Sequence, residues 1–137
     1  MLTHDPARLL RRTLSVNAWI TTANAVAFLA GGHLLSPVFG LSPAVLWLLG
    51  AGLLAFAAHA GYVARKETIS RAEAMYFVAA DSAYVVASVV VLLGFPGLMT
   101  GLGRLFFAAA ADVVAILAVA EYAGLRRLSR LSDRAVA

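Results

Sequence analysis

Residues 74–94 read AMYFVAADSAYVVASVVVLLG, and Asp81 is the one charged side chain among them. About 20 helical residues, each rising 1.5 Å, cross the roughly 30 Å hydrocarbon core of a bilayer. Similar apolar runs occupy residues 13–35, 43–64 and 103–125. Because lipid offers no partner to a free backbone N–H group, a crossing segment of this kind has to be helical. The sequence therefore predicts four transmembrane helices.

The composition of the 137-residue chain agrees with this interpretation. Hydrophobic residues make up 62% of it and charged residues 13%, with a mean hydropathy of +0.87. A soluble domain usually holds about 25% charged residues, and a small one has too little interior to hide so much apolar surface. We therefore expect a single transmembrane domain over residues 1–137. The absence of cysteine excludes disulfides and thiolate metal sites.

The connections between the apolar runs are short. Residues 36–42 and 95–101 contain Pro and Gly breakers, and residues 65–71 form a charged turn. Short connections make consecutive helices antiparallel neighbours. The predicted fold class is all-α, a polytopic transmembrane four-helix bundle with up-down topology.

The cations indicate the orientation of this bundle. Ten of the eleven Lys and Arg residues fall on one side of it, and Arg104 falls on the other. The positive-inside rule places the basic side, with both chain ends, in the cytoplasm. The first run exceeds the 7–15-residue apolar core of a signal peptide, so we expect it to be retained. Because the cations lie where topology requires them, the net charge of +4 does not indicate a nucleic-acid partner.

Polar side chains inside the apolar runs are the candidates for a function, since burying such groups in a bilayer is costly. Those nearest the middle of their helices are expected to turn inward as one layer, and two more to lie below it on the cytoplasmic side. The middle layer comprises Asn24, Asp81, Tyr84 and Asp112, and the lower pair is Asn17 and His59. All six are predicted ligand-binding residues. The catalytic candidates among them are Asp81, Asp112 and Tyr84.

Each candidate also has a purely structural interpretation. Asn17 and Asn24 can hydrogen-bond across helices as a packing device. A buried neutral His59 can bond to Asn17 or Tyr76. Protonated Asp81 and Asp112 can serve as polar links between helices.

Two glutamates and four aromatic residues are expected to have interfacial roles. Glu73 and Glu121 lie near the ends of their runs, where arginines are available to pair with them. One aromatic residue per helix falls near the cytoplasmic interface, as in the aromatic belts of membrane proteins. These residues are Trp19, Tyr62, Tyr76 and Tyr122.

Several chemistries are excluded by spacing. His33 and His59 lie near opposite membrane surfaces, roughly 20 Å apart in depth, so they cannot ligate one haem within a single copy. The sequence contains no Glu-x-x-His metal motif, P-loop or dinucleotide fingerprint. We therefore expect neither a metal nor a cofactor.

Three segments carry a resemblance to known sequences: Arg-x-x-Leu-x-x-Asn-Ala at 11–18, Ala-Asp-Ser-Ala-Tyr-Val-Val-Ala-Ser at 80–88, and Gly-Leu-Arg-Arg at 124–127. Together they resemble a group of short, four-span bacterial integral membrane proteins of uncharacterised function. The resemblance implies a four-helix fold and a bacterial cytoplasmic (inner) membrane. It implies no activity.

Three functions fit these features. The first is a membrane subunit, or a module that binds a lipophilic ligand in its polar layer. The second is a membrane-embedded enzyme on a lipid-like substrate, with Asp81 or Asp112 as general acid or base. The third is a proton-coupled small transporter working as a homodimer, with the same aspartates as proton sites. The expected partners are membrane lipid and either a second copy or a larger membrane complex.

Overall fold

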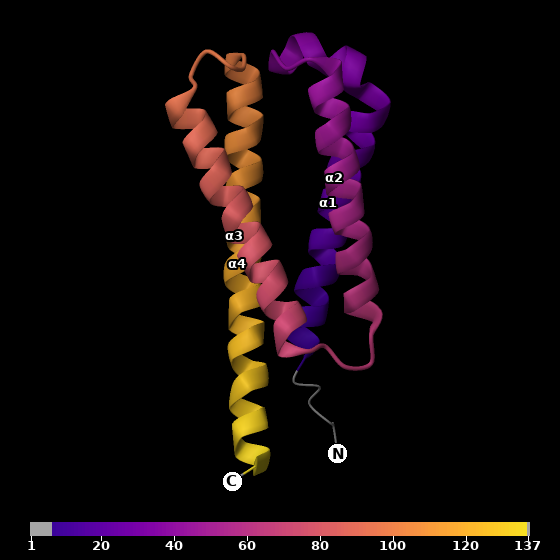
Figure 1. The fold of residues 1–137 in the computed structure, drawn as a ribbon, viewed down its shortest axis with the longest axis vertical. Coiled ribbons are helices and arrows are strands. Elements are labelled where there is room, and N and C mark those ends of the chain that lie inside the picture. Colours follow the sequence, from indigo (N-terminus) through magenta and orange to yellow (C-terminus); the bar gives the residue numbers. More distant parts are fainter. Residues whose placement is uncertain (1–6, 137) are drawn as a thin grey trace.

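The computed structural model describes the backbone of residues 7–136 and the side chains of residues 7–130, and all the regular secondary structure in this part of the chain is helical. Four helices run up and down in succession (Figure 1): α1 (Arg8–Phe39), α2 (Pro43–Arg65), α3 (Arg71–Gly94) and α4 (Gly101–Val136). All four are long and apolar enough to cross a membrane. The predicted all-α, four-helix transmembrane fold is confirmed.

Two helices extend beyond the apolar runs that predicted them. α1 continues through Pro37 and ends at Gly40, whose φ of 76° lies in the left-handed region. Glycine adopts this conformation without a Cβ penalty, which makes it a common helix terminator. α4 spans 36 residues, well past residue 125.

The starts of α2 and α3 follow local capping rules. Ser42 accepts a hydrogen bond from the Val45 N–H group at 3.3 Å, and Pro43 occupies the first turn, where its missing N–H is not needed. Ser70 and Glu73 form a reciprocal capping box at the start of α3. Glu73 also pairs with Lys66 at 2.6 Å, and this hydrogen bond raises the pKa of the Lys66 ammonium group. The prediction that Glu73 pairs with an arginine was therefore wrong.

The helices pack in the spatial order α2–α1–α4–α3. In Figure 1, α1 and α2 form one pair and α3 and α4 the other. The pairs converge toward the end that holds the start of α1, the α2–α3 turn and the end of α4, which we call the terminal end. The α1–α2 and α3–α4 connections lie at the opposite end, which we call the loop end. There the end of α1 contacts the residue before α4, since the Thr100 N–H group donates to the Phe39 carbonyl at 3.0 Å.

A separate hydrophobic cluster stabilises each end. The terminal-end cluster draws on all four helices and includes Leu10, Leu14, Val63, Phe77 and Leu125. The loop-end cluster combines four phenylalanine rings with leucines and Met99. Its aromatic members are Phe28, Phe39, Phe106 and Phe107, with ring centroids 4.9–6.2 Å apart. Between the two clusters the middle of the bundle is less completely filled.

Arg11 connects α1 to the end of α2. Its guanidinium donates hydrogen bonds to the backbone carbonyls of Ala64, Lys66 and Glu67. The last carbonyls of a helix lack partners within the helix, so a cation at this position satisfies them and opposes the helix dipole. Arg11 therefore has a structural role in addition to its contribution to the charge asymmetry.

Two glycines of α2 differ sharply in their surroundings and provide a test of the α1–α2 packing. A Cβ at Gly50 would lie 2.9 Å from Leu29 Cγ and 3.1 Å from the Ala25 carbonyl oxygen, whereas a Cβ at Gly52 meets nothing within 4 Å. We expect Gly50→Ala to destabilise the protein by about 1–3 kcal/mol through overpacking. Gly52→Ala should be neutral or stabilising by up to about 1 kcal/mol, because alanine favours a helix. Unfolding in detergent measures both, and equal effects would contradict the close packing.

Candidate functional site

The side-chain amide of Asn17 links three helices in the interior of the bundle. Its Nδ2 atom donates to Asp81 Oδ2 on α3 at 2.7 Å and to Glu121 Oε1 on α4 at 3.1 Å. Its Oδ1 atom accepts from the Thr21 hydroxyl, one turn along α1, at 3.0 Å. An amide has two N–H donors, and here both are directed at carboxyl groups. We call these four residues the Asn17 cluster.

The Asn17 cluster is closed to solvent. Asn17 is 1% exposed, Asp81 4%, Thr21 8% and Glu121 0%. Glu121 Oε2 has no hydrogen-bond partner within the described part of the chain. The two accepting carboxyl oxygens can be no farther apart than the sum of their distances to the shared nitrogen. Two acidic groups therefore lie close together in an apolar interior, and the described side chains place no cation against either.

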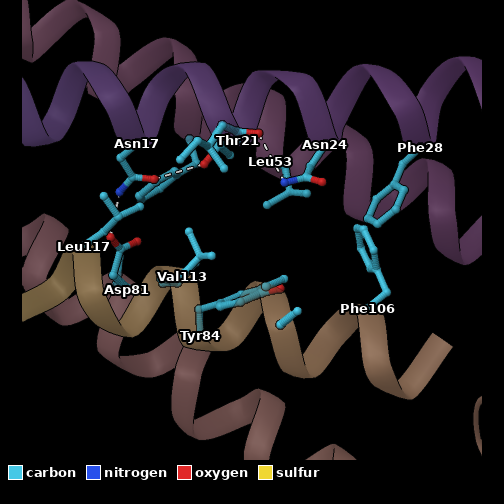
Figure 2. Close-up of a pocket in the computed structure, with 16 residues that line it drawn as sticks. Asn17, Thr21, Asn24, Phe28, Leu53, Asp81, Tyr84, Phe106, Val113 and Leu117 are labelled. Carbon is cyan, nitrogen blue, oxygen red and sulfur yellow. Dashed lines mark hydrogen bonds between the residues drawn. The ribbon is translucent and has the colours of Figure 1, made fainter. Parts of the chain in front are cut away.

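A cavity of about 390 Å³ extends from the Asn17 cluster toward the loop-end cluster. Figure 2 shows Asn17, Thr21, Asn24 and Phe28 along its α1 side, facing Asp81, Tyr84, Val113, Leu117 and Phe106 on α3 and α4. α2 contributes Leu53 and Phe56. All four helices therefore line the cavity, which is polar at one end and mainly apolar and aromatic elsewhere.

Four of the six predicted ligand-binding residues line this cavity: Asn17, Asn24, Asp81 and Tyr84. Asn24 and Tyr84 are half-buried. The Asn24 amide donates to the Ile20 carbonyl of its own helix at 3.2 Å, so it links no helices. The inward layer predicted from α1 and α3 is therefore present, although Asn17 rather than Asn24 makes its hydrogen bonds.

Asp112 does not join this layer, so its predicted inward orientation was wrong. It is exposed on the outer side of α4 and does not line the cavity. Leu117 and Glu121 are buried on the inner face of the same helix. At 100° per residue, Asp112 lies nine residues and about 180° from Glu121. One of the two had to face outward, and it is Asp112.

His59 is also outside the cavity. It is exposed on α2, and its ring lies 5.2 Å from the rings of Tyr76 and Phe77 on α3. The expected buried histidine bonded to Asn17 is therefore wrong, because the Asn17 amide is already occupied by the two carboxyl groups. His59 instead belongs to a contact between α2 and α3 near the terminal end.

Glu121 is the site residue that the sequence reasoning missed, since proximity to arginines suggested an interfacial role. A signal was present in its spacing. Leu117, Glu121, Leu125 and Leu128 recur every three or four residues, the period of one helix face. Of these, Leu117, Glu121 and Leu125 are buried and Leu128 packs on the terminal-end cluster. A glutamate within such an apolar stripe belongs to the interior.

The site combines polar groups at one end with an apolar surface. Its polar end offers carboxyl oxygens and a hydroxyl, and its walls offer apolar and aromatic surface. No group of three or more His, Cys, Asp or Glu residues suited to a metal occurs in the described part of the chain. A proton is the one species that two neighbouring carboxyl groups exchange readily without further machinery.

The dependence of the Asn17 cluster on its amide predicts a mutational effect. Asn17→Leu leaves two buried carboxyl groups without donors and should destabilise the protein by about 1–3 kcal/mol. Asn24→Leu is the matched control and should have a much smaller effect, because it loses one bond within α1. The triple variant Asn17→Leu, Asp81→Leu, Glu121→Leu should recover most of the loss, since apolar replacement of all partners removes the unsatisfied groups. Thermal unfolding in detergent measures all three; equal losses for Asn17→Leu and Asn24→Leu would contradict the role of the cluster.

Comparison with known proteins finds no matching family model, no matching curated protein and no matching solved structure. The functional inference therefore rests on the geometry of the cavity and the Asn17 cluster.

Proposed function

We propose that the protein is a membrane-embedded binding module for a lipophilic molecule with a polar head. The observation that carries this proposal is the cavity of about 390 Å³, polar at the Asn17 cluster and apolar elsewhere. Small-molecule sites typically occupy about 300–1,000 Å³ and combine apolar walls with a few convergent polar groups. The head would bind near Asp81 and the apolar part would extend toward Phe28 and Phe106.

The helix packing supports entry from the bilayer. α2 and α3 stand at opposite ends of the order α2–α1–α4–α3, so the side between them is the least closed. Near the terminal end this side is covered by Phe56 and His59, whose rings contact those of Tyr76 and Phe77. A molecule dissolved in lipid would enter the cavity on the loop-end side of these rings and would not have to pass through water.

An enzyme acting on a lipid-like substrate is the less favoured reading. It was expected to use Asp81 or Asp112 as general acid or base, and of these two Asp112 is exposed on the outer side of α4. Asp81 and Tyr84 remain in the cavity, and Asp81 is engaged with Asn17. A binding role needs no second catalytic group.

We further propose a bacterial inner membrane as the location, with the terminal end facing the cytoplasm. The support is the charge distribution, since ten of the eleven Lys and Arg residues belong to the terminal end. The resemblance to short bacterial four-span proteins agrees with this location. The four exposed aromatic residues expected to form a belt, Trp19, Tyr62, Tyr76 and Tyr122, lie on the same half of the bundle.

A homo-oligomer or a larger membrane complex remains our proposal for partners, and Asp112 supports it. A carboxyl group on a lipid-facing surface is costly unless a partner covers it. A protonated carboxyl both donates and accepts, so it suits a two-fold interface in which each residue meets its counterpart. The exposed apolar residues Leu105, Ile116 and Val119 flank it on α4.

Native mass spectrometry of protein extracted into mild detergent tests the binding proposal. We expect a bound lipophilic molecule on the unmodified protein. Occupancy should be at least tenfold lower on Ala80→Phe, because the phenyl ring introduced there would occupy the cavity. Ala83→Phe is the matched control, because Ala83 is exposed on the same helix and does not line the cavity.

Two results would contradict binding in the cavity. One is unmodified protein without ligand after extraction and after incubation with total membrane lipid. The other is equal occupancy in Ala80→Phe and Ala83→Phe, which would locate the ligand on the outer surface. The melting temperatures of both variants establish that they are folded.

The orientation can be tested by single cysteines, because the chain contains none of its own. Thr68 in the α2–α3 turn and Gly97 in the α3–α4 connection are both exposed, and a Cβ at Gly97 meets nothing within 4 Å. In intact bacterial cells, a membrane-impermeant maleimide should label Gly97→Cys and not Thr68→Cys, and lysis should make both reactive. The reverse pattern would overturn the proposed orientation.

A further inference from the structure

We propose that the molecule bound in the cavity is a lipophilic organic cation, and that it binds in exchange for a proton held between Asp81 and Glu121. This inference rests on the proposed binding function and adds the charge of the ligand and the ion that it displaces. Three independent features of the site support it: its charge, its hydrogen-bonding groups and its aromatic walls.

The charge of the site favours a cation. Asp81 lines the cavity wall and Glu121 lies behind it, bonded to the same amide nitrogen. None of the described residues that line the cavity is Lys, Arg or His. In a low-dielectric interior the attraction between opposite charges is strong, and an isolated anion is costly. A ligand with a carboxylate or phosphate head would be repelled.

The charged and titratable groups around the pair reinforce this conclusion. α1 presents Asn17 and Thr21 to it, both uncharged, and α2 presents Leu53 and Phe56 to the cavity. His59 lies exposed against two rings and outside the lining. On α3 the nearest titratable neighbour is the Tyr84 phenol, and Asp112 of α4 faces outward.

Within the Asn17 cluster, hydrogen-bond acceptors outnumber donors; the other donors of the cavity, the Tyr84 hydroxyl and the second N–H group of Asn24, lie outside the cluster. Both N–H groups of Asn17 are used, the Thr21 hydroxyl donates to Asn17, and the Asn24 amide donates to a backbone carbonyl. Glu121 Oε2, on a side chain with no exposed surface, has no hydrogen-bond partner among the residues that the structure describes. The site lacks a positive charge or a proton beside these carboxyl oxygens, and either one would satisfy the acceptors that have no donor.

The aromatic walls select between a metal ion and an organic cation. Phe28, Phe56, Tyr84 and Phe106 line the cavity and come from all four helices. The faces of aromatic rings attract cations, and cages of such rings recognise quaternary ammonium groups. The described residues hold no group of three or more His, Cys, Asp or Glu side chains suited to a metal ion, and Ca²⁺ takes about six to eight oxygen ligands. A cation with bulky apolar substituents fits the volume and the walls together.

The exchange with a proton follows from the proximity of the two carboxyl groups. Two neighbouring carboxylates in an apolar interior do not both stay ionised, so without a cation one proton is shared between them. When the organic cation arrives, its charge replaces that of the proton, which leaves to water. The net charge within the site is then unchanged. Affinity for the cation should therefore rise with pH, by up to tenfold per pH unit where one proton is released.

The test uses tetraphenylphosphonium, whose permanent charge ensures that any proton released comes from the protein. Binding is measured by isothermal titration calorimetry on full-length protein in nanodiscs, in two buffers of different ionisation enthalpy and over a range of pH. We expect saturable binding, affinity that rises with pH, and a buffer-dependent heat that reports proton release. Empty nanodiscs correct for partitioning of the probes into lipid, and tetraphenylborate, of the same shape and opposite charge, should show no saturable binding beyond that background.

Two variants locate the effect. Asp81→Asn with Glu121→Gln preserves acceptors for the Asn17 amide and should lower tetraphenylphosphonium affinity at least tenfold and abolish its pH dependence. Asp112→Asn is the matched control, since it removes a carboxyl group from the outer face of α4 and should change neither. The fluorescence of Trp19 and Trp47 during unfolding establishes that both variants are folded.

The outcomes separate this inference from the proposed function. Equal binding of tetraphenylborate, or pH-independent binding of tetraphenylphosphonium, would overturn cation–proton exchange. If a neutral lipid occupies the unmodified protein and is lost in Ala80→Phe while tetraphenylphosphonium fails to bind, the cavity binds a ligand but not a cation. If neither binds, both proposals fail.

Discussion

A single side-chain amide holds the middle of this bundle together. Asn17 of α1 donates one hydrogen to Asp81 of α3 and the other to Glu121 of α4, so it determines which face each of three helices turns inward. In a bilayer, apolar packing alone discriminates poorly between faces, because lipid tails are as apolar as leucine. Two carboxyl groups that need hydrogen bonds from the same amide discriminate strongly between the faces of their helices. Rotation of α4 by half a turn would carry Glu121 into lipid and leave the Asn17 amide with one carboxyl partner, Asp81.

The cavity is a consequence of how the hydrophobic residues are distributed. Large side chains concentrate at the two ends of the bundle, in the terminal-end and loop-end clusters. Between them, the α3 and α4 faces that line the cavity include Ala80, Ala109 and Ala110. These alanines lie opposite the Asn17 cluster and leave space that neither the terminal-end cluster nor the loop-end cluster can fill. The same middle region therefore contains the buried acids and the room for a ligand.

The sequence predicted the fold well and the site only in part, for reasons that particular residues make clear. Four apolar runs and the turn residues between them are local signals, and a bilayer leaves the chain few alternatives to helices. Asn17 was identified as an interior residue because it shares a helix face with Asn24, and Asp81 because it stands alone among apolar neighbours. Asp112 met the same criterion and faces outward, whereas Glu121 was discounted for its nearby arginines and faces inward. Which face of α4 meets α1 depends on tertiary packing, and depth along a helix does not report it. Arg11 shows the same limit, because its carbonyl partners lie more than 50 residues away in the chain.

The packing order α2–α1–α4–α3 also bears on how the protein is made. Each short connection joins neighbours in that order, so α1–α2 and α3–α4 are two hairpins that meet along α1 and α4. Before the two hairpins dock, the N–H groups of Asn17 lack their carboxyl partners on α3 and α4, and Asp81 and Glu121 lack the amide that donates to them. Only the docking of one hairpin on the other buries all three. An undocked second hairpin exposes two acids to lipid, a feature by which a membrane protease can distinguish unassembled chains from mature protein.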